Sequence, residues 1–224
     1  GGSGLLVKND EHYENNYENG QGSSGNWVAK YAGALGNNLK VSICPSANAF
    51  ESTLGGTLAV SANGTVVTGT STAFTGNVVA GDILTLNSEE VKVSSVTNST
   101  SLILTAAHAS GAVANASVTR NWEYFRSVDR APGTTEYANN ISSSADEMHV
   151  AVVDEDGGIS KVTGTVLEVY ETVSWQGDNK TENGSINHYK DVVNQRSKWI
   201  RWMDYPTTVT NAGSNTASVA FGSA

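Results

Sequence analysis

The chain has 224 residues, of which 16% are charged, and its formal net charge is −9. This length is enough for one large domain or two small ones with an apolar core. The acidity argues against a nucleic-acid partner, because binding a phosphate backbone requires clustered Lys and Arg. There is no apolar run of about 18 residues, so the sequence predicts no transmembrane helix and no membrane insertion.

The low charge and the abundance of Gly, Ser, Thr and Asn indicate a neutral, hydroxyl-rich surface, as in many extracellular and virion β-proteins. A single cysteine, Cys44, excludes an intramolecular disulfide and a multi-cysteine zinc site. It ends the strand-like run Leu39–Cys44, so we expect a small buried thiol. The chain begins Gly-Gly-Ser-Gly and ends in the small-residue segment Ser214–Ala224. We therefore expect an added linker or a piece of a longer protein.

The first region extends to about Leu54. It opens with the apolar Leu5–Val7 and continues with a polar, acidic loop over Asn9–Gly25. Two β-rich runs follow, Trp27–Tyr31 and Leu39–Cys44. The glycines between these runs predict a turn.

The second region, from about Gly55 to Arg120, has short alternating runs that recur every 8–12 residues. Asn63-Gly64, between the first two runs, is a strong signal for a β-hairpin. Phe74 is the one aromatic residue, so the core must consist of Val, Leu and Ile. The predicted strands are Thr57–Ala62, Thr65–Thr70, Asp82–Leu86, Glu90–Val96, Ser101–Thr105 and Ala116–Thr119. They predict a small all-β barrel or sandwich.

The third region, from Asn121 onward, mixes strands with one helix. Trp122–Phe125 reads as a strand. His149–Val153 and Val166–Val169 lie on either side of an acidic segment. Asp156-Gly157-Gly158 in that segment supplies the left-handed backbone geometry that a reversal needs. The sequence therefore predicts a hairpin here.

Apolar residues from Ile186 onward recur at helical spacing, which predicts a helix from about Ile186 to Ser197 with Ser185 as its N-cap. Trp199–Met203 follows as a strand. The first and third regions both look incomplete alone. The fold class is therefore α+β, with a discontinuous core domain of residues 1–54 and 121–224. Residues 55–120 form an inserted, surface-exposed β-domain.

No residue is predicted to be catalytic, cofactor-binding or metal-binding. An EF-hand loop that starts at Asp154 would need an oxygen ligand, Gly and Glu at its fifth, sixth and twelfth positions. Gly158, Ile159 and Thr165 stand there, so a solvated acidic turn is favoured.

The sequence signals for other kinds of functional site are also weak. The four histidines, His12, His108, His149 and His188, are not at ligand spacing. No nucleophile elbow of the form G-x-S-x-G occurs. A glycosidase needs only two carboxylates, so the 22 acidic residues do not exclude one, but no pair stands out. Trp199 and Trp202, near three basic residues, read as core and edge positions of a strand rather than a nucleic-acid platform.

Three motifs resemble the tail-sheath proteins of contractile-tailed bacteriophages, especially the T-even-like group and its cyanophage relatives. They are WVAKYAGALGNNLKVSIC at 27–44, APGTTEY at 131–137, and the strand-turn-strand of Asp146–Ser174. Ala32 replaces the proline usual in the family, and Thr135 stands where Ser is commoner. The segment Gly64–Leu84 is similar to small β-domains of many phage structural proteins.

This resemblance implies a fragment of a sheath subunit, a structural virion protein that is made in the host cytoplasm and is not an enzyme. Its partners would be other subunits in six-fold rings and the tail tube, which contraction drives through the host envelope. The segments through which family members exchange strands look absent, so we expect the fragment alone to be a monomer. The alternatives are a phage surface β-domain, residues 55–120, that binds a host receptor or glycan, and a virion-associated depolymerase.

Overall fold

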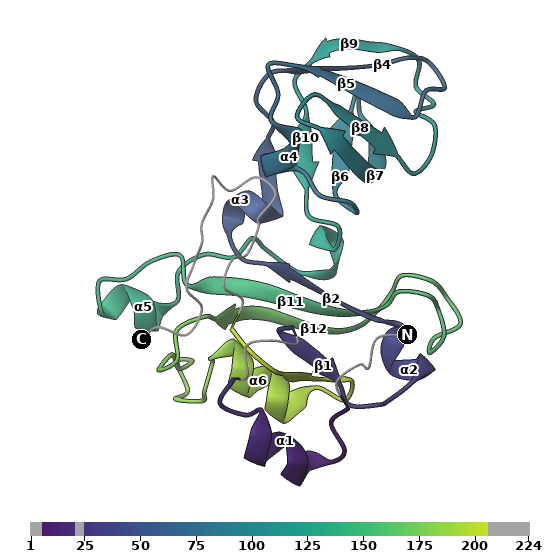
Figure 1. Cartoon of the computed structure of the whole chain (residues 1–224). Helices are drawn as coiled ribbons and strands as arrows, with labels where there is room; N and C mark the ends of the chain where they lie inside the picture. Colours follow the sequence, from purple (N-terminus) through teal and green to yellow (C-terminus); the bar gives the residue numbers. More distant parts are fainter. Residues whose placement is uncertain (1–5, 21–24, 206–224) are drawn as a thin grey trace. The chain divides into compact units, whose positions relative to one another are not determined.

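The computed structural model describes residues 6–20 and 25–205. The chain packs into two compact units (Figure 1). Unit 1 contains the described residues up to Ile43 and from Pro132 onward, and unit 2 is Cys44–Ala131. Segments 44–54 and 121–131 therefore pack with the middle of the chain. The sequence pattern instead predicts domain boundaries at residues 54 and 121. At a coarse level the fold is α+β and rich in strands.

Unit 1 is built on a three-stranded sheet in the order β12-β11-β2. These strands are β2 (Leu39–Cys44), β11 (Glu147–Asp154) and β12 (Thr165–Ser174). All eight residues of β11 are buried. A central strand that is covered on both faces explains why its middle reads as a continuous apolar run.

The predicted hairpin over Asp146–Ser174 is confirmed. β11 and β12 pair antiparallel from Glu147↔Ser174 to Asp154↔Thr165. The register shifts after Met148, where Thr172 adopts a left-handed φ of 50° and donates its backbone N–H to Nδ1 of His149 (3.0 Å). This β-bulge bends the hairpin locally.

A second, two-stranded sheet in unit 1 joins parts of the chain that lie far apart in sequence. β1 (Trp27–Ala29) pairs antiparallel with β13 (Ile200–Trp202). Both strands were predicted, although they are shorter than the predicted runs. The helices of this unit are α1 (Asp10–Asn16), α2 (Ala34–Asn37), α5 (Glu136–Asn140) and α6 (Tyr189–Arg196).

The predicted start of the long helix was wrong. α6 begins at Tyr189 with His188 as N-cap, three residues after the expected Ile186. Asn187 is held beside β12, because its carbonyl accepts the backbone N–H of Ser174 (2.8 Å). Ser185 instead closes a short turn, in which its carbonyl accepts the backbone N–H of Thr181 (2.9 Å). These hydrogen bonds keep the segment out of the helix.

Unit 2 is an eight-stranded antiparallel sheet in the order β3-β10-β6-β7-β8-β5-β4-β9, with three short helical segments. Its strands are β3 (Glu51–Thr53), β4 (Thr57–Val60), β5 (Val66–Thr70), β6 (Ile83–Leu86), β7 (Glu89–Asn98), β8 (Ser101–Leu104), β9 (Val113–Ala116) and β10 (Thr119–Asn121). Its helical segments are α3 (Ala47–Phe50), α4 (Phe74–Asn77) and the 3-10 helix η1 (Phe125–Ser127).

β7, the longest strand of unit 2, pairs with a different neighbour along each half of its length. Its first residues, up to Lys92, pair with β6, and the rest, from Val93, pair with β8. Bulges after Val93 and Val96 let the strand bend between its two neighbours. The hairpin predicted from Asn63-Gly64 is confirmed as the β4–β5 connection, with Asn63 at a left-handed φ of 55°.

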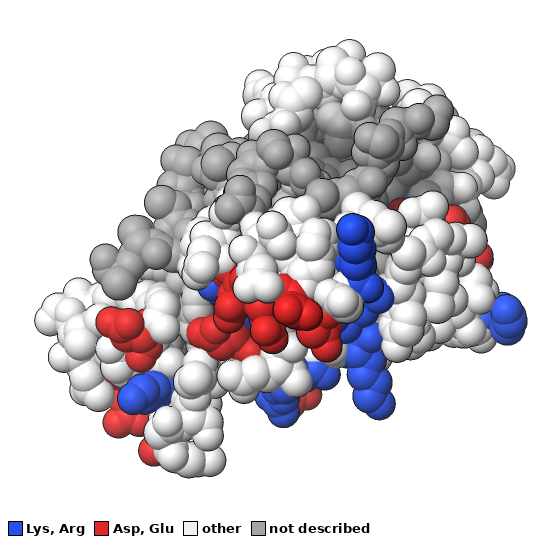
Figure 2. Space-filling model, turned by 60° about the horizontal axis from the view of Figure 1, so that its bottom comes forward, with Lys and Arg blue, Asp and Glu red and all other residues white. Residues whose placement is uncertain are grey.

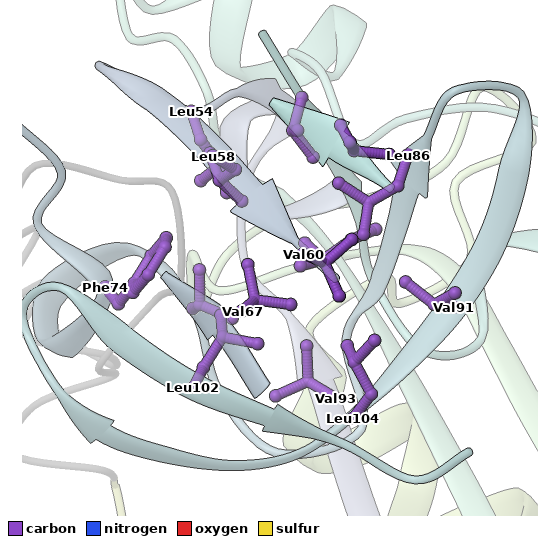
Figure 3. Packing of buried hydrophobic residues seen from close by; sticks show 14 residues of the cluster. Leu54, Leu58, Val60, Val67, Phe74, Leu86, Val91, Val93, Leu102 and Leu104 are labelled. Atoms are coloured by element: carbon purple, nitrogen blue, oxygen red, sulfur yellow. The ribbon is translucent and has the colours of Figure 1, made fainter. Parts of the chain in front are cut away.

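The core of unit 2 is aliphatic, as its composition predicts (Figure 3). Val67, Leu84 and Leu102 are fully buried, and Phe74 is the one aromatic member of the cluster. Burying one such aliphatic side chain contributes about 1.5–3 kcal/mol, so these contacts are the main source of stability in this unit.

Residues 55–120 were predicted to form a barrel or a sandwich, and of these two the barrel is wrong. None of the sheets formed by the described residues is closed, because β3 and β9 remain the two ends of the strand order. One predicted strand is also wrong. The run Trp122–Phe125 is not a strand. It forms a turn that leads into η1, and the rings of Trp122 and Tyr124 pack edge to face at 5.5 Å.

Candidate functional site

The three motifs of the sequence come together in unit 1. β2, the end of the first motif, lies next to β11 in the sheet. The second motif is joined to the start of β11 by two hydrogen bonds between Gly133 and Glu147: Gly133 N–H to Glu147 Oε2 (2.7 Å) and Glu147 N–H to Gly133 O (3.2 Å). The third motif is the β11–β12 hairpin itself. The structure thus connects segments that are separated by more than a hundred residues.

Asp146 joins the second motif to the third. Its side chain is fully buried and accepts four hydrogen bonds. Thr135 donates its backbone N–H to Oδ1 (2.8 Å) and its hydroxyl to Oδ2 (2.8 Å). Ser174 Oγ (2.6 Å) and Asn179 Nδ2 (2.9 Å) donate to the same Oδ2. We call these four residues the Asp146 network.

The local sequence explains how this network forms. Thr135 is the N-cap of α5, and its Oγ1 accepts the backbone N–H of Ala138 (3.1 Å). The same hydroxyl donates to Asp146, so it uses both its donor and an acceptor site. Ser carries the same hydroxyl, so Thr135→Ser is expected to keep both hydrogen bonds.

The acidic turn between β11 and β12 is organised by a second buried carboxylate. Oδ2 of Asp154 accepts hydrogen bonds from Ile159 N–H (3.0 Å), Ser160 N–H (2.6 Å) and Ser160 Oγ (2.7 Å). Burial by itself would raise the pKa of Asp154, but the hydrogen bonds from Ser160 and Ile159 outweigh it and hold this pKa below its usual value.

The turn was expected to be solvated, and this holds only for Glu155 and Asp156, which are exposed. Asp154 is instead part of the interior. The first motif also contacts this turn, because the carbonyl of Asn38 accepts the backbone N–H of Glu155 (2.7 Å). A Cβ at position 158 would lie 1.7 Å from Asn38 Nδ2, so any other residue there would displace the end of the Asn38 side chain.

The four histidines occupy separate environments. His12 lies in α1, and His108 is buried in unit 2, where its Nδ1 is 2.8 Å from the carbonyl of Gly111. His149 is in β11, and His188 pairs its Nδ1 with Asp191 Oδ2 at 3.0 Å. Within residues 6–20 and 25–205, no group of three or more His, Cys, Asp or Glu is placed to hold a metal ion.

Of the aromatic and basic residues near the end of the described chain, Trp202 lies in the interior of unit 1, whereas Arg196 and Lys198 are exposed. Trp202 is fully buried and donates its indole N–H to the hydroxyl of Tyr189 (3.0 Å). Trp199 packs against Tyr31, and Arg201 forms an ion pair with Asp10. On the face shown in Figure 2, acidic side chains gather in one group and basic side chains beside it form a narrow row. Trp202 is therefore not available to stack on nucleic-acid bases, whereas Tyr31 beside Trp199 is 47% exposed.

Unit 2 buries two ionisable groups that form an ion pair. Nε of Arg120 lies 3.2 Å from Oδ2 of Asp82, and both side chains are almost completely buried. Burial raises the pKa of Asp82 to about 6, although Arg120 and the backbone N–H of Val79 act in the opposite direction. Cys44 is also buried, as expected, and burial raises its pKa to about 12.

The sequence pattern alone does not single out the members of the Asp146 network. Thr135, Ser174 and Asn179 are common polar residues 11, 28 and 33 positions from Asp146. No short motif links them, and the one signal was that two of the three quoted motifs contain Thr135, Asp146 and Ser174.

Comparison of the chain with models of known protein families, with curated proteins and with solved structures gave no match. None of the helices in the described part of the chain is long and apolar enough to cross a membrane.

Proposed function

We propose that this chain is a part of the sheath subunit of a contractile bacteriophage tail. The proposal is supported by one observation above all. Three sequence motifs that resemble the sheath family, at 27–44, 131–137 and 146–174, meet around β11, and the Asp146 network joins the second to the third. Motifs that belong to one structural core are expected to contact one another, as these do.

The physics of unit 1 fits a mechanical role. A contracting sheath needs subunits that move as rigid bodies between two packings, with no chemistry at a site. The fully buried strand β11 and the four hydrogen bonds on Asp146 stiffen this unit. Buried polar networks in which every member is satisfied specify one arrangement of the core. In the proposed role the partners are other sheath subunits in six-fold rings and the tail tube, and the location is the virion.

Unit 2 would then be a decoration inserted into the sheath domain. The alternative role for residues 55–120, binding of a host receptor or glycan, receives less support. Phe74 is the one aromatic residue of that segment, and it is 1% exposed in the core. The segment therefore offers no aromatic surface on which a sugar ring could stack.

Electron microscopy tests the proposal. Antibodies raised against the purified chain are applied to phage particles whose genome encodes this sequence, with pre-immune serum as the control. The expected result is gold label along the length of the tail in both extended and contracted particles. Label on the capsid or fibres, or none on intact particles, would overturn the proposal.

A second measurement addresses assembly. We expect the purified chain alone to be a monomer in light scattering. Stable hexamers of the isolated chain would contradict this expectation.

A further inference from the structure

A small pocket in unit 1 adjoins the Asp146 network. It has a volume of about 300 Å³, at the lower end of the range for small-molecule sites. The pocket lies between the end of α5 and the segment that follows β12. Its walls are formed by Tyr137, Ile141, Ser143, Trp175, Gln176, Gly177 and Asp178.

The walls of this pocket are held in place before any ligand binds. Trp175 donates its indole N–H to the carbonyl of Ala145 (3.1 Å) and its backbone N–H to the carbonyl of Asp146 (3.0 Å). On the opposite side, Ser143 donates its backbone N–H to the carbonyl of Ala138 in α5 (2.8 Å). The indole ring of Trp175 is therefore already ordered, so little of the binding free energy is lost in ordering the site.

Gln176 is the unusual member of the wall. Its side chain belongs to a residue that is only 8% exposed, and Nε2 donates to Ser143 Oγ (2.7 Å). Its Oε1 is buried and accepts no hydrogen bond from the described residues. An unpaired buried acceptor costs free energy unless something else donates to it. Because this oxygen is buried, a hydroxyl in the pocket does not reach it, and the polar groups open to a ligand are those of Ser143 and Asp178.

The chemistry of the wall restricts the ligand. Tyr137, Trp175 and the 57% exposed Ile141 provide apolar surface, against which the C–H face of a ring can pack. Asp178 provides acceptors and Ser143 a hydroxyl for groups at the edge of that ring. No Lys or Arg lines the pocket, and the carboxylate of Asp178 repels anions. The pocket thus suits a neutral ring that has one apolar face and several hydroxyl groups.

We propose that this pocket binds a neutral pyranose, either a monosaccharide or the end of a glycan chain. This inference does not depend on the proposed function, because it rests only on the pocket and on the chemistry of its walls. It also differs from glycan binding by residues 55–120, since the pocket lies in unit 1.

The test uses the ¹⁵N-labelled full chain and follows the five tryptophan indole signals by NMR. The signal of Trp175 is assigned by its loss in Trp175→Phe. The probes are methyl β-D-glucopyranoside, methyl α-D-mannopyranoside and N-acetylglucosamine, with p-cresol as an apolar ring of similar size. We expect a saturable shift of the Trp175 signal with at least one pyranose, and unchanged signals from the other four tryptophans.

Variants separate binding at this pocket from binding elsewhere. Tyr137→Ala removes one apolar wall and is expected to weaken the affinity about tenfold. Tyr31→Ala, which removes a 47% exposed ring outside the pocket, is the control and should bind as the wild type does. The four other indole signals report whether each variant is folded. If Tyr137→Ala does not fold, Asp178→Ala on the exposed rim takes its place.

Three results would overturn the proposal. The first is no saturable shift with any of the three pyranoses. The second is unchanged affinity in the folded wall variant. The third is binding of p-cresol without binding of any pyranose, which would identify an apolar side-chain pocket instead.

Discussion

Replacing Asp146 with asparagine keeps the size of the side chain but removes its charge and turns one acceptor oxygen into an N–H donor. The two oxygens of Asp146 accept four hydrogen bonds in a fully buried site. If the new amide nitrogen replaces Oδ1, it faces the fixed backbone N–H of Thr135. If it replaces Oδ2, it faces the fixed amide of Asn179. In both orientations at least one donor loses its acceptor.

The cost follows from two contributions. A hydrogen bond to a charged group is worth about 1.5–3 kcal/mol, and leaving its buried donor unpaired costs about 1–3 kcal/mol more. Asp146→Asn should therefore lower the free energy of unfolding of unit 1 by about 4 kcal/mol. Native domains are stable by only about 5–15 kcal/mol, so this variant should unfold at a clearly lower urea concentration.

Urea unfolding followed by tryptophan fluorescence measures this effect. Four of the five tryptophans lie in unit 1, so the signal reports mainly on that unit. Asp156→Asn, at an exposed position in the same hairpin, is the matched control and should change the stability by less than about 0.5 kcal/mol. A loss below about 1 kcal/mol in Asp146→Asn would refute the role given to this network.

Three further predictions concern the chain from Cys44 to Ala131. The folded pKa of Asp82, about 6, lies above its unfolded value, so protonation stabilises the fold, and this contribution is lost as the pH rises through 6. Between pH 7 and pH 5 the wild type should therefore gain about 1 kcal/mol of unfolding free energy relative to Asp82→Asn, and an unchanged difference in urea titrations at the two pH values would contradict this. Gly56→Ala should lower the melting temperature of unit 2, because Gly56 has a φ of +79° and its Cβ would lie 2.3 Å from the carbonyl of Thr70. The strain is about 1–3 kcal/mol, whereas Gly55→Ala, with open space around it, should melt as the wild type does. Cys44, buried and with a pKa of about 12, should react with a disulfide reagent at pH 8 only after denaturant is added, and rapid labelling of the native chain would count against its burial.

The strands were the part of the fold that the sequence revealed best. The alternation of apolar and polar residues in 57–104 and the Asn63-Gly64 turn predicted the positions of most strands of unit 2 to within a few residues. The order of those strands was not accessible, because β3, β10 and β9 join the sheet through pairings between segments far apart in the chain. Local pattern predicts that a strand exists, while its neighbours depend on packing across the whole unit.

The errors have physical causes of the same kind. Ile186 fits a helical stripe, yet the hydrogen bond between Ser174 and Asn187 holds that segment extended until His188. The aromatic run Trp122–Phe125 has a high strand propensity, but its rings pack within a turn. The Asp146 network could not be predicted, since each of its hydrogen bonds joins residues whose proximity exists only in the folded chain.

The insertion of unit 2 also sets the order in which the chain can fold. β2 must wait for its partner β11, which is synthesised about a hundred residues later, and closing so long a loop is slow. Unit 2 lies entirely between these two strands, and its β3–β10 pairing brings its own first and last segments together. When unit 2 folds first, it shortens the effective loop from about a hundred residues to segments 45–50 and 122–146, roughly thirty residues. Mutations that weaken unit 2 should therefore also delay the folding of unit 1, although they leave every contact within unit 1 unchanged.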